Sequence, residues 1–248
     1  MGRKKTGAAA ALLGAIAEAE AKTTTQGEED LNALKGLLKQ FLQKDASPER
    51  AALKREYDLG CPMTGPDGLR RKLGAIDMEF FGRAYFPHYF SRPSPEFHRE
   101  LDNIWQQGVL KDRAPLTPAD ARAINRLPGV RRVVAAPRGH AKSTNLTFKG
   151  TMHSALYEYK HYPIIISDSS DQAEGFLDNI RVEFEENGAI RADFGDLAGP
   201  VWRANVLVTK SSIKIEAIGS GKKIRGRKHR NWRPDLIILD DVENDENV

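Results

Sequence analysis

The stretch that decides the expected fold reads Ala136-Pro137-Arg138-Gly139-His140-Ala141-Lys142-Ser143-Thr144. A short apolar run at 132–135 predicts a strand before it, and the sequence from Asn145 onward predicts a helix after it. The order strand, glycine-containing loop, Lys-Ser/Thr and helix builds a phosphate-binding loop, because backbone N–H groups and the helix dipole point at the anion. The pattern predicts that Lys142 contacts the outer phosphates and that the Ser143 hydroxyl ligates Mg²⁺.

This loop departs from the usual pattern G-x-x-x-x-G-K-[ST], because both glycines are replaced, by Ala136 and Ala141. Alanine tolerates a positive φ poorly, so Gly139 is the residue expected to supply that freedom. An ordinary strand–loop–helix connection is the alternative interpretation of the stretch taken alone.

A second signal lies near the end of the sequence, where Leu236-Ile237-Ile238-Leu239 is followed by Asp240-Asp241-Val242-Glu243. Four consecutive branched apolar residues are typical of a strand buried on both faces of a parallel sheet. Acids at its carboxyl end lie where open α/β sheets bind their ligands. We therefore expect Lys142 and Asp240 to converge on one magnesium–triphosphate pocket at one edge of the sheet.

The composition indicates a folded protein with a charged surface. The chain has 248 residues, of which 40% are hydrophobic and 29% charged, with a formal net charge of +4. A basic balance favours contact with a polyanion. The single Cys61 excludes an internal disulfide and a cysteine-rich zinc site. No transmembrane segment is expected, and the signal-like and myristoylation-like patterns in the first 21 residues are interpreted as chance.

Three regions are expected along the chain. Residues 1–30 form a low-complexity arm, 31–127 a mainly helical region, and 128–248 an α/β core. The helical region is expected to contain helices at 29–43, 48–57, 96–107 and 118–126. The core is expected to contain strands at 163–167, 206–209, 213–217 and 236–239, and a helix running from a cap at 168–171 to about Glu186, with Gly188 just past its end.

Aromatic residues are concentrated between residues 75 and 105, and most are expected to lie in the core. They are Phe80, Phe81, Tyr85, Phe86, Tyr89, Phe90 and Phe97. A role for 86–98 in stacking on an adenine base is the functional alternative. His88 and His98 lack the spacing of zinc ligands.

A basic cluster precedes the last predicted strand. It contains Lys222, Lys223, Arg225, Arg227, Lys228, Arg230 and Arg233, with no acid among them. A solvated loop is one interpretation. Contact with DNA phosphates, or an arginine offered to the nucleotide of a neighbouring subunit, is the other.

These motifs together resemble the large subunit of tailed-phage terminases, the ATP-driven motors that package DNA into a prohead. The resemblance rests on 137–144, Ser169-Ser170-Asp171-Gln172-Ala173, Arg225-Gly226-Arg227 and the run from Arg233 to Asp241. It covers roughly residues 75–248.

The resemblance implies an α/β fold of the P-loop NTPase class, a RecA-like parallel sheet preceded by a mainly helical lid, with ATP and Mg²⁺ as cofactors. The nucleotide-binding residues it implies are Pro137, Arg138, Gly139, His140, Ala141, Lys142, Ser143 and Thr144, with Arg138 as the loop arginine. Ser143 and Asp240 would hold the metal. Asp241 stands where the family usually has the glutamate that polarises water, and Glu243 is a rival for that role.

The partners implied are double-stranded DNA, the small terminase subunit, the portal of the prohead and further copies of the chain in a ring. The location implied is the host cytoplasm. The family continues into a nuclease, whereas this sequence stops at Val248, so we expect an incomplete core that binds ATP weakly and hydrolyses it slowly or not at all. Two alternatives stay open: another nucleic-acid-dependent P-loop ATPase, and a truncated non-catalytic remnant that binds only DNA or a partner.

Overall fold

The computed structural model describes residues 27–109 and 131–242 of the chain. The expected helix at 118–126 and Glu243 lie outside these residues. The chain divides into two compact units, Met1–Met63 and Thr64–Val248, which are described separately.

The first unit contains two helices. Residues 27–42 are helical, and α2 (Pro48–Asp58) follows with its proline in the first turn, where a missing N–H costs nothing. Leu34, Leu38 and Leu42 are buried, as the helical spacing of the leucines predicts, whereas Leu31 of the same pattern is exposed. The Arg50 guanidinium donates to the Phe41 carbonyl oxygen at 2.7 Å, which ties α2 to the end of the preceding helix. Both helices expected here are confirmed.

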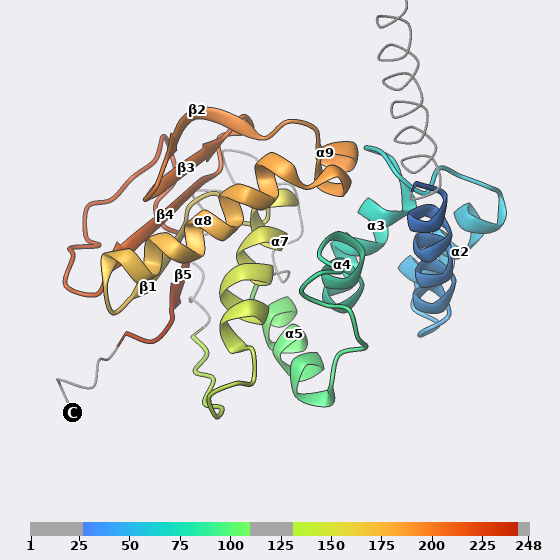
Figure 1. Ribbon diagram of the computed structural model, residues 1–248, viewed down its shortest axis with the longest axis horizontal. Coiled ribbons are helices and arrows are strands. Elements are labelled where there is room, and N and C mark those ends of the chain that lie inside the picture. The colour runs from blue at the N-terminus through green and yellow to red at the C-terminus, as the bar shows by residue number, and fades with distance from the viewer. Residues whose placement is uncertain (1–26, 110–130, 243–248) are drawn as a thin grey trace, which may run out of the picture. The chain divides into compact units, whose positions relative to one another are not determined.

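The second unit is an α/β structure around a mixed five-stranded sheet in the order β2-β3-β4-β1-β5 (Figure 1). Strands β4 (Lys214–Gly219), β1 (Pro163–Ser167) and β5 (Leu236–Leu239) run parallel. Strands β2 (Ala198–Arg203) and β3 (Val206–Thr209) extend it as antiparallel neighbours. The strands expected at 163–167, 206–209 and 236–239 are confirmed, and the one expected at 213–217 lies at 214–219.

Helices cover one face of this sheet. Ile165 is in register with Ala217 and Ile238, so the three side chains point to the same face. The helix α8 (Ser170–Glu186) packs on Ile165 and Ala217 and is drawn across the sheet in Figure 1. The further helices of the second unit are α3 (Leu69–Ile76), α4 (Met78–Tyr85), α5 (Glu96–Val109), η2 (Ser143–Gly150), α7 (Thr151–Leu156) and α9 (Gly188–Phe194).

The segment between β4 and β5 covers the opposite face. Ile164, Ile166 and Ile218 are buried there, and Ile224 and Trp232 of that segment pack against them. Ile237 and Leu239 point to the same face by register but are exposed, Leu239 by 64%. The outer edge of β5 has no strand partner among the described residues.

One expectation about local structure is wrong. Residues 132–135 form no strand, and Val133 is 97% exposed, because two valines and an alanine among arginines bury too little apolar surface to hold an edge strand. Gly188 lies just past the end of α8 at Glu186, as expected, and it also begins α9, a helix that the sequence did not predict. The Asn187 side chain accepts hydrogen bonds from the N–H groups of Ala189 and Ile190, and so caps a new helix at that point.

Candidate nucleotide site at the carboxyl edge of the parallel strands

Asp240 follows β5 and is held beside the end of β1. Its backbone N–H donates to the Ile166 carbonyl at 2.9 Å, and the Ser167 hydroxyl donates to the Asp240 carbonyl at 2.6 Å. The residue is only 9% exposed. A carboxylate is therefore fixed at the edge of the sheet where parallel strands end, which is where α/β proteins bind ligands.

The helix that follows the loop reaches this acid. Thr147 of η2 donates a buried hydrogen bond of 2.6 Å from its hydroxyl to Asp240 Oδ2, across 93 residues of sequence. Because η2 begins at Ser143, directly after Lys142, this bond places Asp240 against the helix that follows the loop. Thr147 was missed by the sequence reasoning, although its hydroxyl lies about one turn after Ser143.

The loop needs two residues with positive φ, and only one of them is glycine. Gly139 has φ +82°, and Ala141 has φ +50°, at the position where the usual pattern has its second glycine. A β-carbon is unfavourable in this region, so Ala141 holds a strained conformation. Its carbonyl accepts the N–H of Asn145 at 3.0 Å and the Asn145 side-chain amide at 3.1 Å, which stabilises the strained turn.

Lys142 is folded onto its own loop. Its ammonium donates to the carbonyl of Ala136 at 2.5 Å and contacts that of Pro137 at 3.5 Å. A lysine ammonium has three N–H donors. The described residues provide acceptors for two of them, the carbonyl oxygens of Ala136 and Pro137. The charge thus lies at the open loop, where residues 137–141 are all exposed and accessible to an anion.

The start of α5 supports the loop. His98 Nε2 is 3.0 Å from the His140 carbonyl oxygen, and the rings of Phe97 and His140 meet edge to face at 5.9 Å.

The core interpretation of most aromatic residues is confirmed, since Phe80, Phe81, Tyr85, Phe86 and Phe90 are buried. Tyr89 is 45% exposed, and stacking of this region on an adenine base stays a prediction.

The acid proposed to orient water is exposed at the same edge. Asp241 has φ +45°, a conformation that aspartate tolerates better than most residues. Its carbonyl oxygen accepts the N–H of Asp168, the residue after β1, at 3.0 Å. The choice between Asp241 and Glu243 stays open, because Glu243 lies outside the described residues.

The residues present fit a magnesium nucleotide. Within 27–109 and 131–242, no three His, Cys, Asp or Glu side chains gather into a metal cluster. Mg²⁺ in nucleotide sites is held by one or two protein ligands together with the phosphates and water, so one carboxylate and one hydroxyl suffice. Asp240, with one oxygen bonded to Thr147, and Ser143 at the start of η2 are the residues that would hold the ion.

The basic segment, defined as residues 220–233, contains the predicted nucleic-acid contacts. Its exposed cations are Lys222, Lys223, Arg225, Lys228, Arg230 and Arg233. Arg227 differs from them, because it is partly buried and its guanidinium forms an ion pair with Glu216 of β4.

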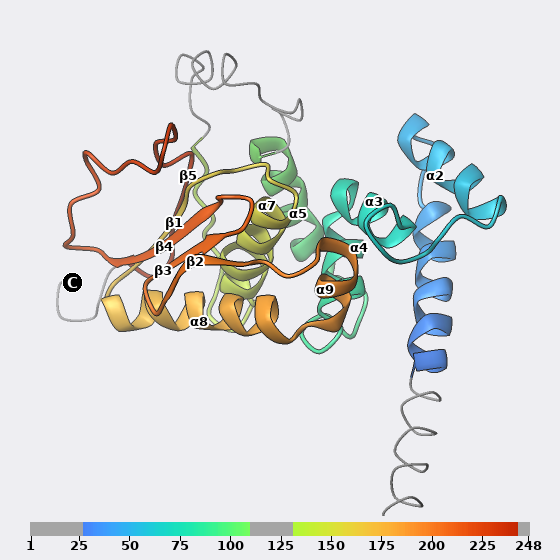
Figure 2. The same cartoon turned by 90° about the horizontal axis from the view of Figure 1, so that it is seen from above.

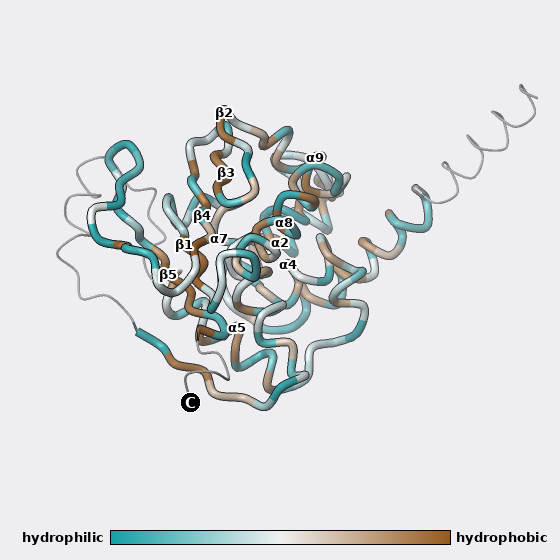
Figure 3. Tube along the Cα trace, turned by 60° about the vertical axis from the view of Figure 1, so that its left-hand side comes forward, coloured by the Kyte–Doolittle hydropathy of each residue, from teal (hydrophilic) through white to brown (hydrophobic). Residues whose placement is uncertain are grey.

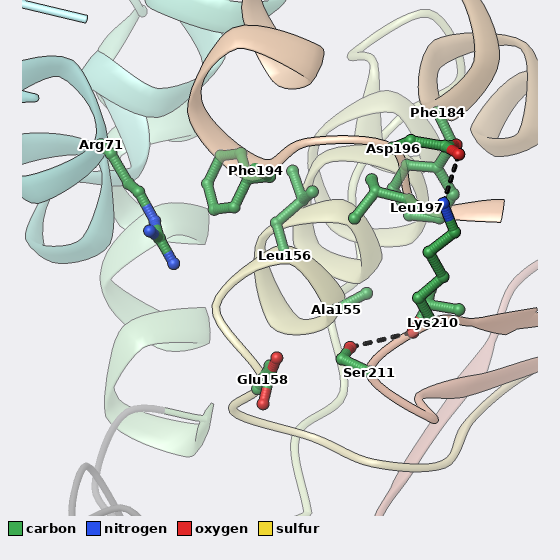
Figure 4. A pocket seen from close by; sticks show the side chains of 11 residues that line it. Arg71, Ala155, Leu156, Glu158, Phe184, Phe194, Asp196, Leu197, Lys210 and Ser211 are labelled. Carbon is green, nitrogen blue, oxygen red and sulfur yellow. Dashed lines mark hydrogen bonds and ion pairs between the residues drawn. The ribbon is translucent and has the colours of Figure 1, made fainter. Parts of the chain in front are cut away.

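A small cavity lies elsewhere in the second unit (Figure 4). It measures about 140 Å³ and is lined by apolar side chains of α7 and α8, with the Lys210–Asp196 ion pair at one side. The turn that contains Lys210 and Ser211 precedes β4, so it lies at the amino edge of the parallel strands, opposite Asp240. This cavity is therefore not part of the candidate nucleotide site.

In the part of the chain that the structure describes, no helix is long and apolar enough to cross a membrane. No protein-family profile matches the chain, and searches of curated proteins and of solved structures found no match.

Proposed function

We propose that this chain is a magnesium-dependent ATPase of the P-loop class, the motor portion of a tailed-phage terminase large subunit that powers the packaging of double-stranded DNA. The observation that carries the proposal is the buried hydrogen bond between Thr147 and Asp240. It places an acid from the end of a parallel strand against the helix that begins at the Lys142 loop. Such an arrangement of loop, helix and acid supports phosphoryl transfer from a nucleotide.

The side chains of this site have distinct tasks in the proposed reaction. Lys142 would exchange the carbonyls of Ala136 and Pro137 for phosphate oxygens, and the N–H groups at the start of η2 would bind the same anion. Asp240 and Ser143 would hold Mg²⁺, which neutralises charge on the phosphates when it is bound. Asp241 or Glu243 would accept a hydrogen bond from the attacking water and orient it in line.

A cationic side chain is also needed where negative charge increases during the reaction. Arg138 is exposed in the loop and is the candidate within the same chain. An arginine from a neighbouring copy in a ring would act in the same way, and such residues increase rates by roughly 10³- to 10⁵-fold in related chemistry. Assembly with further copies, the small terminase subunit and the portal is part of the proposal.

Phosphate release measured with and without duplex DNA tests this function. We expect weak ATP binding and at most slow hydrolysis, which duplex DNA stimulates and which both Lys142→Ala and Asp240→Asn abolish. Lys39→Ala, which removes an exposed charge from the 27–42 helix, is the matched control and should behave as the wild type. Stronger stimulation by single strands or RNA would favour another nucleic-acid-dependent ATPase. Nucleotide binding that Lys142→Ala leaves unchanged would favour a non-catalytic remnant.

A further inference from the structure

The basic segment begins at the nucleotide edge of the sheet. The N–H and the hydroxyl of Ser220 both lie within hydrogen-bond distance of the Asp168 carbonyl, at 3.4 and 3.1 Å. Asp168 in turn donates its N–H to the carbonyl of Asp241. Figure 2 shows the chain from β4 to β5 as a wide red-orange loop, which therefore starts beside the candidate catalytic acids.

The middle of the segment is held by a partly buried ion pair. Arg227 Nη1 is paired with Glu216, and Arg227 Nε donates to the Lys223 carbonyl at 3.0 Å. Glu216 also accepts a hydrogen bond from the Tyr162 hydroxyl and is 3.0 Å from the Lys214 ammonium. Burial raises the pKa of Glu216, but the hydrogen bonds from Tyr162 and Lys214 and the charges of Lys214 and Arg227 outweigh it, so the pKa lies below its usual value.

The far end of the segment is held by aromatic stacking and backbone pairing. Trp232 stacks on His161, which precedes β1, with ring centroids 3.7 Å apart and planes 7° from parallel. His229 and Trp232 exchange backbone hydrogen bonds of 2.9 and 2.8 Å, and His229 Nε2 is 3.0 Å from the Ser212 carbonyl. The segment is thus fixed at its start, middle and end along one face of the sheet.

Most of the side chains that remain exposed in the segment are cations. Figure 3 shows the segment mostly in the teal of hydrophilic residues, beside the brown of β1 and β5. Its one aromatic residue besides His229 is Trp232, whose ring is already stacked. Proteins that bind single strands stack bases on free aromatic rings, whereas contact with the duplex backbone requires only charge. This segment offers charge without a free ring.

We propose that the basic segment is a preformed contact for the phosphates of double-stranded DNA, independent of base sequence. Five of its six exposed cations make the contacts, namely Lys222, Lys223, Arg225, Lys228 and Arg230. Arg227 is a positioning residue that holds the segment through Glu216 and does not contact the phosphates. The choice of duplex DNA as the partner rests on the proposed function. The surface itself follows from the contacts of Ser220, Arg227 and Trp232, which fix the segment on the sheet.

Binding of the full chain to a short fluorescent duplex, measured by anisotropy over a salt series, tests the contact. Each phosphate contact adds about 0.9 to the slope of log K against log salt. The double variant Lys222→Ala/Lys223→Ala should reduce the slope by about 1.8, so its affinity falls about tenfold less than that of the wild type between roughly 50 and 200 mM salt. Lys35→Ala/Lys39→Ala removes the same charge from the 27–42 helix and should leave the slope unchanged. Equal slopes for the two double variants would overturn the proposal, as would tighter binding of a single strand of the same length.

The positioning role of Arg227 is tested with a variant for which the change in charge and the loss of the ion pair predict opposite changes in DNA affinity. Glu216→Gln removes a negative charge, so charge alone would strengthen DNA binding. Loss of the Arg227–Glu216 ion pair predicts the opposite result, which is weaker DNA binding with an unchanged salt slope. It also predicts faster trypsin cleavage within the basic segment. Arg227→Ala should behave alike, and a slope reduced by about 0.9 would instead make it a direct phosphate contact.

Failure of this proposal is distinguishable from failure of the proposed function. DNA binding is measured without nucleotide, and Lys142→Ala should retain it in full. A chain that binds the duplex as described but does not bind ATP would refute the ATPase and leave the DNA contact standing. A chain that binds ATP but shows no salt-dependent duplex binding would refute the contact alone.

Discussion

At the scale of single residues, the candidate site depends on how one buried carboxylate is held. Asp240 receives its hydrogen bond from Thr147, whereas the sequence pattern draws attention to Ser143. A hydroxyl that bonds one carboxylate oxygen fixes the rotamer and leaves the other oxygen for a cation. Thr147 therefore positions Asp240 and is not itself expected to touch the nucleotide.

Thr147→Val should lower the free energy of unfolding by about 1–3 kcal/mol, because it leaves a buried carboxylate oxygen without its donor. Thr147→Ser keeps the hydroxyl and should restore most of the loss. Thr151→Val is the matched control: Thr151 is also buried, one turn further along, and its hydroxyl has no hydrogen-bond partner within the described residues. Urea unfolding checks all three, and an equal loss for Thr147→Val and Thr151→Val would contradict the assignment.

The two alanines of the loop make a second test. Ala141 has positive φ and Ala136 does not, so glycine relieves strain only at 141. Ala136→Gly should cost about 0.4–1 kcal/mol through the entropy of the unfolded chain, whereas Ala141→Gly should be neutral or stabilising. The same urea experiment checks this pair, and a loss at 141 as large as that at 136 would show that the loop is not strained there.

At the scale of elements, buried ionic contacts join segments far apart in sequence. Asp193 of α9 is fully buried and accepts hydrogen bonds from the Arg70 guanidinium of α3 at 2.7 and 2.9 Å, and from the Tyr85 hydroxyl of α4 at 2.6 Å. It also accepts the N–H of Gly65 at 2.7 Å. One carboxylate thus connects three helices of the second unit.

Asp193→Ala should destabilise the protein by about 3–5 kcal/mol, because the Arg70 charge stays buried without its partner. Asp196→Ala breaks an exposed pair with Lys210 and an exposed 3.3 Å hydrogen bond from the Ala198 N–H, so it is the matched control and should change stability little. Thermal and urea unfolding measure both. A similar small effect for the two variants would mean that the buried cluster does not join the helices.

The contact between β4 and the basic segment predicts a dependence on pH. The pKa of Glu216 in the folded protein lies below its usual value of 4.5, so the carboxylate stabilises the fold above that value. This stabilisation is lost as the pH falls through the lower, folded pKa. Wild type should exceed Glu216→Gln in stability at pH 6, and the difference should shrink below about pH 4.5. Glu28→Gln, at an exposed position, is the control. A difference in stability between wild type and Glu216→Gln that stays constant down to pH 3 would refute this role of the Glu216 carboxylate.

At the scale of the whole molecule, the sequence predicted what depends on local pattern. Runs of branched apolar residues at 163–167 and 236–239 predicted the parallel strands β1 and β5. The expected burial on both faces holds for β1 but is wrong for β5, which is an edge strand with Ile237 and Leu239 exposed. The strand β2 was not predicted, because Gly199 and Pro200 are residue types that are uncommon inside strands. The strand at 132–135 was predicted wrongly, because so short a run forms a strand only when a neighbouring element buries its apolar side chains. The order of the strands and the Thr147–Asp240 bond are tertiary features that no local spacing encodes.

The central claim is that the amine of Lys142 and the carboxylate of Asp240 serve one magnesium nucleotide. Calorimetric titration of ATP into the full chain, with and without Mg²⁺, tests it most directly. We predict that Mg²⁺ tightens binding to the wild type, that Asp240→Asn binds equally with and without the metal, and that Lys142→Ala weakens binding in both conditions. A full Mg²⁺ effect in Asp240→Asn, or wild-type affinity in Lys142→Ala, would contradict the claim.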